Sequence, residues 1–455
     1  MAPFGRMGLT AVLAGSLCTL YLTPLLASAA SARPARSSGL TAGCGWSVTD
    51  SPALAGSSIL YGVHAIAADD VWAVGKAGDV LSPGSLAEHW DGDEWSVVPT
   101  PNPTRSEQDG NVLDAVDATG PNDVWAVGSH IRRAGIGTGP LIVHFDGSRW
   151  RKVAPPAGRF LDSSLTGVVA IAPDDAWIVG ARVPRGSLDE APLAMHWDGT
   201  AWRTVRAPNP PGDRDDLLTA VTATGPDDVW AVGQAGERTT LTMHFDGTRW
   251  LTVPSPNPSG EARASLTGVV ALAPDDVWAD GTGGAPNSGI SEHWDGTSWT
   301  LATMQVKGQF EELAGITAQA DGTVWAVGLV RPDEPEYQTM AQRFKGTAWS
   351  ITRTPSLDKG DQLESVTSAG GEVWSVGVTA AGPDFQPGAA LILHRCGLEG
   401  SDCDYRGLGT GWTYAATSLR KVGDDDGVHG EAHPPRPGGR GVGGREPARL
   451  RRSGR

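Results

Sequence analysis

Hydrophobic and polar residues alternate along most of this chain in short runs that are separated by turn residues. Residues 217–233, LLTAVTATGPDDVWAVG, hold an alternating run, a Gly-Pro-Asp-Asp turn and a second apolar run. Residues 239–256 add the run TTLTMHF, a tight Asp-Gly turn and a last run that ends at proline. Alternation with period two and turns of this chemistry predict four consecutive antiparallel β-strands, here called a to d in chain order.

This four-strand pattern recurs along the chain. A strand-b motif of the type DVWAVG occurs seven times, with its tryptophan at positions 72, 125, 177, 230, 278, 325 and 374. The strand c to d motif HWDGDEW at 89–95 returns at 144–150, 196–202, 244–250 and 293–299, and in degenerate form at 343–349. Repeats of this length predict propeller blades. We expect an all-β fold, a seven-bladed β-propeller over residues 44–396 with four antiparallel strands per blade.

The repetition also indicates what the motif does. A His–Asp pair could be catalytic, and two tryptophans could form a platform for a sugar. A catalytic pair is usually made once, whereas a structural solution is made once per repeat. Of the 18 tryptophans, only Trp412 falls outside the repeat. We therefore interpret the repeated tryptophans and the motif histidines as scaffold; these histidines are His89, His144, His196, His244 and His293.

The seventh repeat lacks its strand d at the C-terminal end. The missing segment is found near the N-terminus, where CGWSVTDSP at 44–52 matches DEWSVVPTP at 93–101. We expect this N-terminal strand to close the last blade, which would remove two exposed sheet edges. Cys44 and Cys396 then fall on the two sides of one hairpin. Because an exported protein meets oxidising conditions, we predict a Cys44–Cys396 disulfide.

The order VWAVG, HFDG, Trp and VPSP resembles kelch-type β-propellers, including the propeller domain of galactose oxidase. The chain departs from the kelch pattern by one glycine where kelch has two, and by a shorter turn before the tryptophan. The resemblance implies the fold and not an activity. Galactose-oxidase chemistry needs copper and a tyrosine crosslinked to cysteine. The propeller has no cysteine beyond the predicted disulfide, so we expect neither that chemistry nor any cofactor or metal.

The two ends of the chain differ from the repeats. Residues 1–32 read as a signal peptide, with Ala-x-Ala cleavage sites in ASAASA at 27–32, and an uncleaved membrane anchor is the alternative. Residues 33–43 form a linker, and residues 397–455 have the composition of a disordered tail. These features predict a secreted protein, extracellular or associated with the cell wall, without stable membrane insertion after cleavage.

Charge limits the class of partner. Residues 44–396 contain 23 basic and 44 acidic residues, a net charge of −21 within a chain whose total is −16. Such a body repels phosphate backbones, so nucleic acid is excluded as the expected partner. An extracellular carbohydrate or protein remains, and we expect the protein to act as a monomer.

Two functions remain open. The first is a non-enzymatic recognition module that binds an extracellular glycan, wall polymer or protein. The second is an extracellular hydrolase or lyase that acts on polysaccharide, although the catalytic residues of such an enzyme are unknown. The absence of a distinct catalytic motif favours the first.

The a–b and c–d turns are uniform, whereas the b–c and d–a connections vary, so we expect the ligand on the face with the variable connections, near the central channel. The candidate ligand-binding residues are Arg132, Arg133, Arg185, Arg214, Asp280, Glu336, Tyr337 and Asp384. Asp280 is the strongest candidate because it replaces the valine of the strand-b repeat. A lone acid at an apolar position needs a partner, a ligand or exposure, and the simplest interpretation is that a neighbouring loop solvates it.

Overall fold

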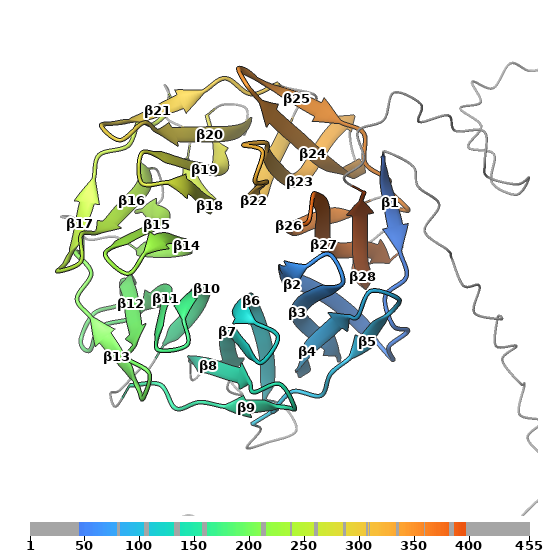
Figure 1. Ribbon diagram of the computed structural model, residues 1–455, viewed down its shortest axis with the longest axis horizontal. Helices are drawn as coiled ribbons and strands as arrows, with labels where there is room; N and C mark the ends of the chain where they lie inside the picture. The colour runs from blue at the N-terminus through green and yellow to red at the C-terminus, as the bar shows by residue number, and fades with distance from the viewer. Residues whose placement is uncertain are drawn as a thin grey trace, which may run out of the picture. The chain divides into compact units, whose positions relative to one another are not determined.

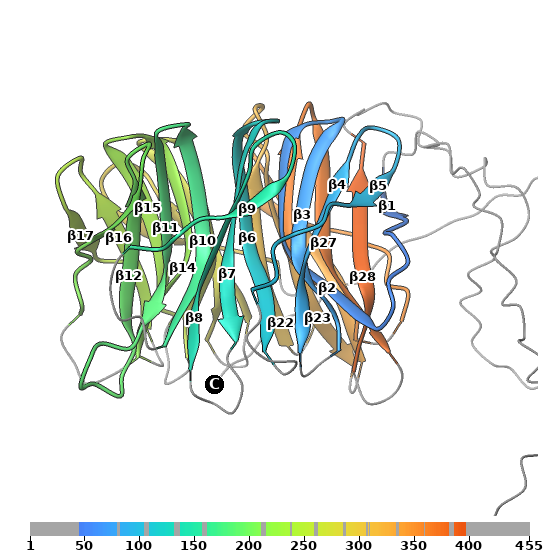
Figure 2. The same ribbon diagram turned by 90° about the horizontal axis from the view of Figure 1, so that it is seen from below.

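The computed structural model describes residues 45–79, 82–103, 109–131, 137–156, 162–210, 215–236, 239–258, 263–284, 288–305, 308, 310–333, 336–358, 360–381 and 386–396. Within these ranges the chain forms seven four-stranded antiparallel sheets arranged in a ring (Figure 1). The predicted seven-bladed β-propeller is confirmed. Figure 2 shows the strands of the blades running from one face of the ring to the other.

The strands follow the predicted order a to d in each blade. Blade 1 contains β2 (Ser57–Ala67), β3 (Asp70–Gly78), β4 (Pro83–Trp90) and β5 (Trp95–Val97). Blade 2 contains β6 (Gly110–Gly120), β7 (Asp123–Ile131), β8 (Thr138–Phe145) and β9 (Trp150–Lys152). Blade 3 contains β10 (Ser163–Ala172), β11 (Asp175–Arg182), β12 (Ala191–Trp197) and β13 (Trp202–Val205). Blade 4 contains β14 (Asp216–Gly225), β15 (Asp228–Ala235), β16 (Thr239–Phe245) and β17 (Trp250–Val253).

Blades 5 to 7 complete the ring. Blade 5 contains β18 (Ser265–Ala273), β19 (Asp276–Gly283), β20 (Ser288–Trp294) and β21 (Trp299–Ala302). Blade 6 contains β22 (Phe310–Ala318), β23 (Val324–Asp333), β24 (Glu336–Lys345) and β25 (Ala348–Thr352). Blade 7 contains β26 (Gln362–Ala369), β27 (Glu372–Ala381) and β28 (Gln386–Arg395), and its outermost strand is β1 (Trp46–Thr49).

The ring closes as the sequence predicts. β1 pairs antiparallel with β28, and Trp46 lies opposite Arg395 (Figure 1). Cys396 follows β28 directly, and its thiol has no disulfide partner among the described residues. Cys44 lies outside the described residues, so the disulfide stays a prediction. The predicted signal peptide, linker and tail, residues 1–43 and 397–455, lie outside the described residues as well.

Tryptophans hold neighbouring blades together. At each of the seven interfaces the strand-b tryptophan of one blade meets the strand-d tryptophan of the next blade edge to face. Ring centroids are 5.1–5.9 Å apart and the planes cross at 79–90°. Trp325 and Trp46 form this contact at the closing blade. Aromatic pairs in this geometry add stabilisation beyond the area they bury, and the scaffold interpretation of the tryptophans is confirmed.

The motif histidines have an equally regular structural role. In five blades the histidine Nε2 lies 2.5–2.8 Å from the aspartate Oδ1 at the start of strand b, and in blade 7 His394 makes the same contact to Glu372 at 3.0 Å. The same imidazoles lie on the strand-b tryptophan, with centroids 3.9–4.6 Å apart. In blade 6 the Arg343 guanidinium lies over Trp325 in place of the imidazole.

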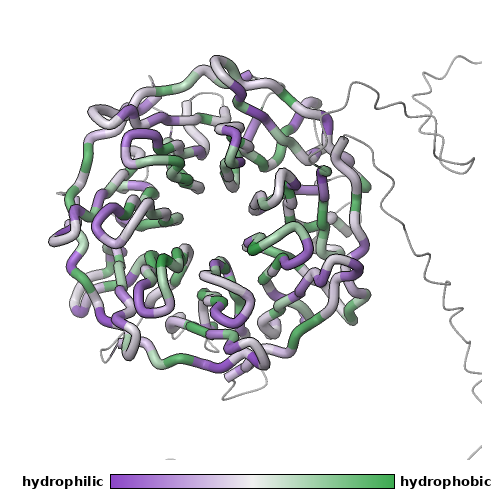
Figure 3. The backbone as a smooth tube through the Cα atoms, in the orientation of Figure 1, coloured by the Kyte–Doolittle hydropathy of each residue, from purple (hydrophilic) through white to green (hydrophobic). Residues whose placement is uncertain are grey.

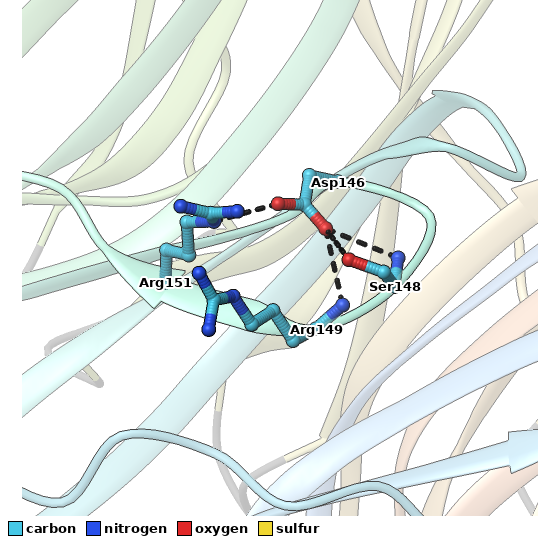
Figure 4. A network of polar contacts seen from close by, with 4 residues as sticks. All are labelled: Asp146, Ser148, Arg149 and Arg151. Carbon is cyan, nitrogen blue, oxygen red and sulfur yellow. Dashed lines mark hydrogen bonds and ion pairs between the residues drawn. The ribbon is translucent and has the colours of Figure 1, made fainter.

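The two faces of the ring carry different connections. The a–b and c–d turns lie together: a side chain added at the turn glycine of five blades would meet an Asp or Asn of the a–b turn. Figure 4 shows one such turn, in which Asp146 Oδ1 accepts hydrogen bonds from the N–H groups of Ser148 and Arg149, and Arg151 binds Oδ2. Figure 3 shows hydrophilic residues at these turns and apolar residues along the strands. The b–c and d–a connections lie at the opposite face, named here the loop face.

Candidate functional site

A cavity of about 300 Å³ occupies the central channel, and all seven innermost strands line it. Each strand contributes consecutive residues to the wall. In β2 these are Tyr61, Gly62 and Val63, and in β6 they are Asp114, Ala115 and Val116. Equivalent positions of the seven blades therefore line the cavity, and the residues at these positions can be compared from blade to blade.

Every innermost strand carries a β-bulge at the first of these positions. In blade 1 the pairing with β3 skips from Leu60 to Gly62, so Tyr61 has no partner in the ladder. The same shift occurs once in each of the other six blades. A bulge re-aims the side chain of the extra residue. The seven residues at this bulge position all line the cavity; they are Tyr61, Asp114, Thr166, Thr219, Thr267, Ala314 and Glu364.

In blades 3, 4 and 5 the bulge residue joins one blade to the next. The hydroxyl groups of Thr166, Thr219 and Thr267 donate hydrogen bonds of 2.7–2.8 Å to a leucine carbonyl oxygen in the following blade. The acceptors are Leu218, Leu266 and Leu313. These three threonines therefore serve the scaffold, and their hydroxyl protons are already used.

Blades 7, 1 and 2, which are adjacent in the ring, carry ionisable residues at the same position. Glu364 and Asp114 flank Tyr61, whose ring lies 5.4 Å from the ammonium of Lys76 in β3. Gln362 Nε2 donates to Glu364 Oε1 at 2.7 Å. Glu312 of blade 6 adds its charge to the field at Glu364. Tyr61, Lys76, Asp114, Glu312 and Glu364 are named here the channel cluster.

Burial sets the acidities in this cluster. It raises the pKa of Asp114 to about 7, although the Lys76 ammonium opposes the shift. Burial also raises the pKa of Glu364 to about 7, and repulsion from Glu312 adds to it. The pKa of the Tyr61 hydroxyl is raised by burial as well, against a hydrogen bond and the charge from Lys76. Shifts of this kind, in carboxyl groups that face a cavity, are typical of functional sites.

The channel cluster lies in the half of the channel nearer the loop face. Tyr61 is closer to Ser57, where β2 begins after the d–a connection, than to the a–b turn that follows Ala67. Lys76 lies two residues before the end of β3, where the b–c connection begins. This is the face on which we expect the ligand from the sequence; the residues of the channel cluster differ from the candidates named there.

On the other side of the cavity, toward the a–b turns, His64 and Asp117 form a second polar contact. His64 Nδ1 lies 2.6 Å from Asp117 Oδ1, and Asp117 Oδ2 accepts a hydrogen bond of 2.7 Å from the Ala170 N–H group. The pair therefore ties blades 1, 2 and 3 together. Its carboxylate is occupied by protein groups, which makes it part of the scaffold.

Asp280 does not lie in a loop. Its side chain is 0% exposed, so the interpretation that a neighbouring loop solvates it is wrong. Within the described residues neither of its carboxylate oxygens has a hydrogen-bond partner of normal geometry, and the backbone N–H groups of Gly268 and of Asp280 itself oppose the effect of burial only in part. A side chain added at Gly268, which lines the channel, would come within 2.5 Å of Asp280 Oδ1. Burial raises the pKa of Asp280 to about 8, so the group is largely protonated at neutral pH.

The other predicted residues do not come together at one site. Arg185 is exposed on the b–c connection of blade 3. Tyr337 in β24 packs against Phe310, and Arg331 lies 5.9 Å from its ring centroid. The Glu336 backbone belongs to β24, and its side chain lies outside the described part of the chain. Arg132, Arg133, Arg214 and Asp384 also lie outside it.

The sequence did contain a signal for the channel cluster. The strand-a motif reads LTGVVA in blades 3 and 5 and LTAVTA in blade 4, but LDAVDA, LESVTS and LYGVHA at 113–118, 363–368 and 60–65. The second letter is the bulge position. An alternating strand would turn this residue toward a blade interface, so only the bulge reveals that it faces the channel.

Neither a metal site nor a membrane span is found in the part of the chain that the structure describes. No group of three or more His, Cys, Asp or Glu side chains there is placed to hold a metal ion. No helix there is long and apolar enough to cross a membrane.

Comparison with known proteins shows similarity of fold only. The chain matches no family model and no curated protein. Similar solved structures include YCF48 bound to D1 peptide (13% identity, TM-score 0.47, covering 77% of this chain and 96% of that chain). The WD40 β-propeller domain of Doa1 matches with 10% identity and a TM-score of 0.48, covering 77% of this chain and 97% of that chain.

A third similar structure is the SapL1 lectin in complex with α-methyl fucoside, with 13% identity and a TM-score of 0.42, covering 66% of this chain and 98% of that chain. At these identities and scores the likeness carries no argument about ligand. The assignment of the fold rests on the strand pairing, and the kelch-type pattern remains a resemblance.

Proposed function

We propose that this protein is an exported, non-enzymatic recognition module that binds an extracellular glycan, wall polymer or protein at the channel cluster. The observation that carries the proposal is the distribution of residues at the bulge position. Three blades place threonines there that join the scaffold, while three adjacent blades place Glu364, Tyr61 and Asp114 in the same cavity. Groups without a role in packing, gathered on a rigid wall, are expected of a binding site.

The dimensions of the cavity support recognition of a small group. A volume of about 300 Å³ lies at the lower end of the range for ligand pockets. The wall is built from innermost strands that are hydrogen-bonded within their blades, so the site is formed before the ligand arrives. A preformed site avoids the cost of ordering side chains on binding. A single residue of a larger ligand would enter the channel, and the variable connections of the loop face would contact the rest.

One observation favours the second candidate, an enzyme that acts on polysaccharide. The pKa values of Asp114 and Glu364 are both raised to about 7, and both residues line one cavity. A carboxyl group with a pKa near the working pH is suited to general acid–base catalysis. The binding experiment therefore has to follow turnover as well.

The test is a screen of glycans, wall polymers and exported proteins against the full chain, with product formation followed in each mixture. The variants Glu364→Gln and Asp114→Asn should weaken the strongest interaction at least tenfold. Asp227→Asn and Asp275→Asn are matched controls, because they remove the same charge from exposed a–b turns on the opposite face. Equal loss in the controls would contradict the proposed site, and turnover that depends on Asp114 and Glu364 would establish the enzyme.

A further inference from the structure

The threonine donors in the cavity wall are already engaged. The hydroxyl groups of Thr166, Thr219 and Thr267 donate to backbone carbonyl oxygens. The Lys76 ammonium donates to the Tyr61 oxygen, and Gln362 donates to Glu364. The acidic groups that the wall presents to a ligand are the carboxyl groups of Asp114 and Glu364, and an ionised carboxylate accepts hydrogen bonds and does not donate them.

The Asp114 carboxyl group is the clearest of these acceptors. Burial dominates its environment, and Lys76 is the only group that opposes the effect. No hydrogen bond to this carboxyl group is found within the described ranges, although it lines the cavity. Burying an ionised group without a hydrogen bond is costly, and a ligand that donates hydrogen bonds would remove that cost.

The charges around the cavity also favour a ligand that donates hydrogen bonds and carries a positive charge. Glu364 and Asp114 are two carboxyl groups in the field of a single ammonium, that of Lys76, and the charge of Glu312 acts on Glu364 as well. The shifted pKa values of Glu364 and Asp114 report that this one cation does not compensate them. A second cation beside either carboxylate would gain from it, and the net charge of the propeller body would attract that cation at long range.

The rest of the wall is small and mostly apolar. Ala115, Ala220 and Ala314 lie in it, together with Ser365, glycines and a layer of valine and isoleucine side chains at the third lining position. The apolar side chains of this wall suit an aliphatic stem.

From these observations, and resting on the proposed function, we infer that the channel cluster binds a primary alkylammonium group, the side chain of an exposed lysine on a protein partner. Its N–H donors match the acceptor oxygens that Asp114 or Glu364 presents to the cavity, and its carbon stem matches the apolar part of the wall. The charges of Lys76 and Glu312 act on these carboxyl groups.

Binding of a cation should depend on pH in a defined direction. Asp114 faces Tyr61 and Lys76, and Glu364 faces Tyr61, Lys76 and Glu312. Both carboxyl groups are partly protonated near neutral pH, and the cation favours their ionised forms. Affinity for the ammonium should therefore rise between pH 6 and pH 8, and binding should release protons into the buffer.

The experiment is a calorimetric titration of the full chain with four probes. They are the peptide acetyl-Gly-Lys-Gly-amide, its form acetylated on the lysine nitrogen, the arginine counterpart, and a glucosamine tetramer. We expect the lysine peptide to bind with proton release, measured in two buffers of different ionisation enthalpy. Acetylation of the lysine should weaken binding at least tenfold, and so should Glu364→Gln or Asp114→Asn.

The controls are again Asp227→Asn and Asp275→Asn, which should leave lysine binding unchanged. Equal binding of the acetylated peptide, equal loss in the controls, or preference for the arginine peptide or the glucosamine tetramer would overturn the inference. No binding of the lysine peptide would overturn it too. If the channel variants still abolish the strongest interaction from the screen, the proposed site stands and only the ligand class is wrong.

Discussion

The two halves of the channel wall share one backbone and differ in side chains. In blades 3, 4 and 5 the bulge threonines donate hydrogen bonds to the following blade, and the wall is closed by the protein's own groups. In blades 7, 1 and 2 the same backbone position holds Glu364, Tyr61 and Asp114. These three form no such inter-blade bond in the part of the chain that is described. The first half joins neighbouring blades, and we propose that the second half binds the ligand.

This comparison teaches how a repeat protein can acquire a site. A bulge in every innermost strand provides seven equivalent positions that face one cavity. Any position released from inter-blade bonding can carry other chemistry without a change of backbone. This change lowers the stability of the folded ring, because burial disfavours the charged form of the carboxyl groups that replace threonine and so raises their pKa values.

The largest expected effect concerns ring closure, which lies within the half that carries the channel cluster. The predicted Cys44–Cys396 bond would constrain a loop of about 350 residues, for which the chain-entropy relation gives at most about 5–6 kcal/mol. Cys396→Ser should lower the free energy of unfolding toward that limit, measured by denaturant titration of exported protein. Cys403→Ser should have no effect. Peptide mapping that finds both Cys44 and Cys396 as free thiols would contradict the disulfide.

The second effect concerns Asp280, at the interface between blades 5 and 6 in the half with the threonine bonds. Burial raises the pKa of Asp280 in the folded state to about 8, well above the ordinary value of an aspartate, so the folded state keeps a proton that the unfolded state releases. The stability that this proton contributes is present below pH 4 and is lost as pH rises toward 8. Asp280→Val restores the repeat and should raise the free energy of unfolding at pH 8 by several kcal/mol, on the order of 5.

The measurement for Asp280 is thermal and denaturant unfolding between pH 4 and pH 8. Asp280→Asn is the matched variant: it removes the titration but keeps a buried polar group, so it should flatten the pH dependence with a smaller gain. A pH dependence unchanged in both variants would show that Asp280 does not titrate in this range.

A third experiment replaces one residue of the channel cluster by the threonine that blades 3, 4 and 5 carry at the same position. Glu364→Thr should place a hydroxyl group where it donates to the Leu60 carbonyl oxygen, as Thr166 does to Leu218. One such bond contributes about 1 kcal/mol, so the unfolding midpoint should rise while ligand binding falls at least tenfold. Thr219→Ala should lower the midpoint by a similar amount. Loss of stability in Glu364→Thr would mean that Glu364 serves the scaffold.

The smallest effect is expected at Ala314, the bulge residue of blade 6. Ala314→Thr should add a hydrogen bond to the Leu363 carbonyl oxygen and stabilise the ring by about 1 kcal/mol or less. Ala314→Val is the control, because it adds similar volume without a hydroxyl group. The difference between their unfolding midpoints isolates the hydrogen bond, and equal midpoints would show that the bond does not form.

The sequence predicted the architecture because the same strand pattern occurs in seven copies. Each copy gave the two-residue period, the turn residues and the tryptophans, so blade number, strand order and closure by residues 46–49 followed from pattern alone. The His–Asp motif was correctly interpreted as scaffold for the same reason. The face on which the ligand binds stays a prediction, drawn from the variable length of the b–c and d–a connections.

The site residues required the tertiary structure. Asp280 differs from the valine of the other repeats and was therefore the strongest candidate in the sequence. Its side chain is nevertheless buried in a blade interface. Strand pairing decides where a side chain points, and a difference from the repeat does not. Asp114 and Glu364 also broke the repeat, at a position that alternation assigns to an interface. Only the bulge turns that position into the channel, and only ring closure brings blades 7, 1 and 2 together around one cavity. The sequence by itself determined which residues repeat and which do not. The folded ring decided which of the exceptions share a cavity, because that depends on distances between residues about 300 positions apart in the chain.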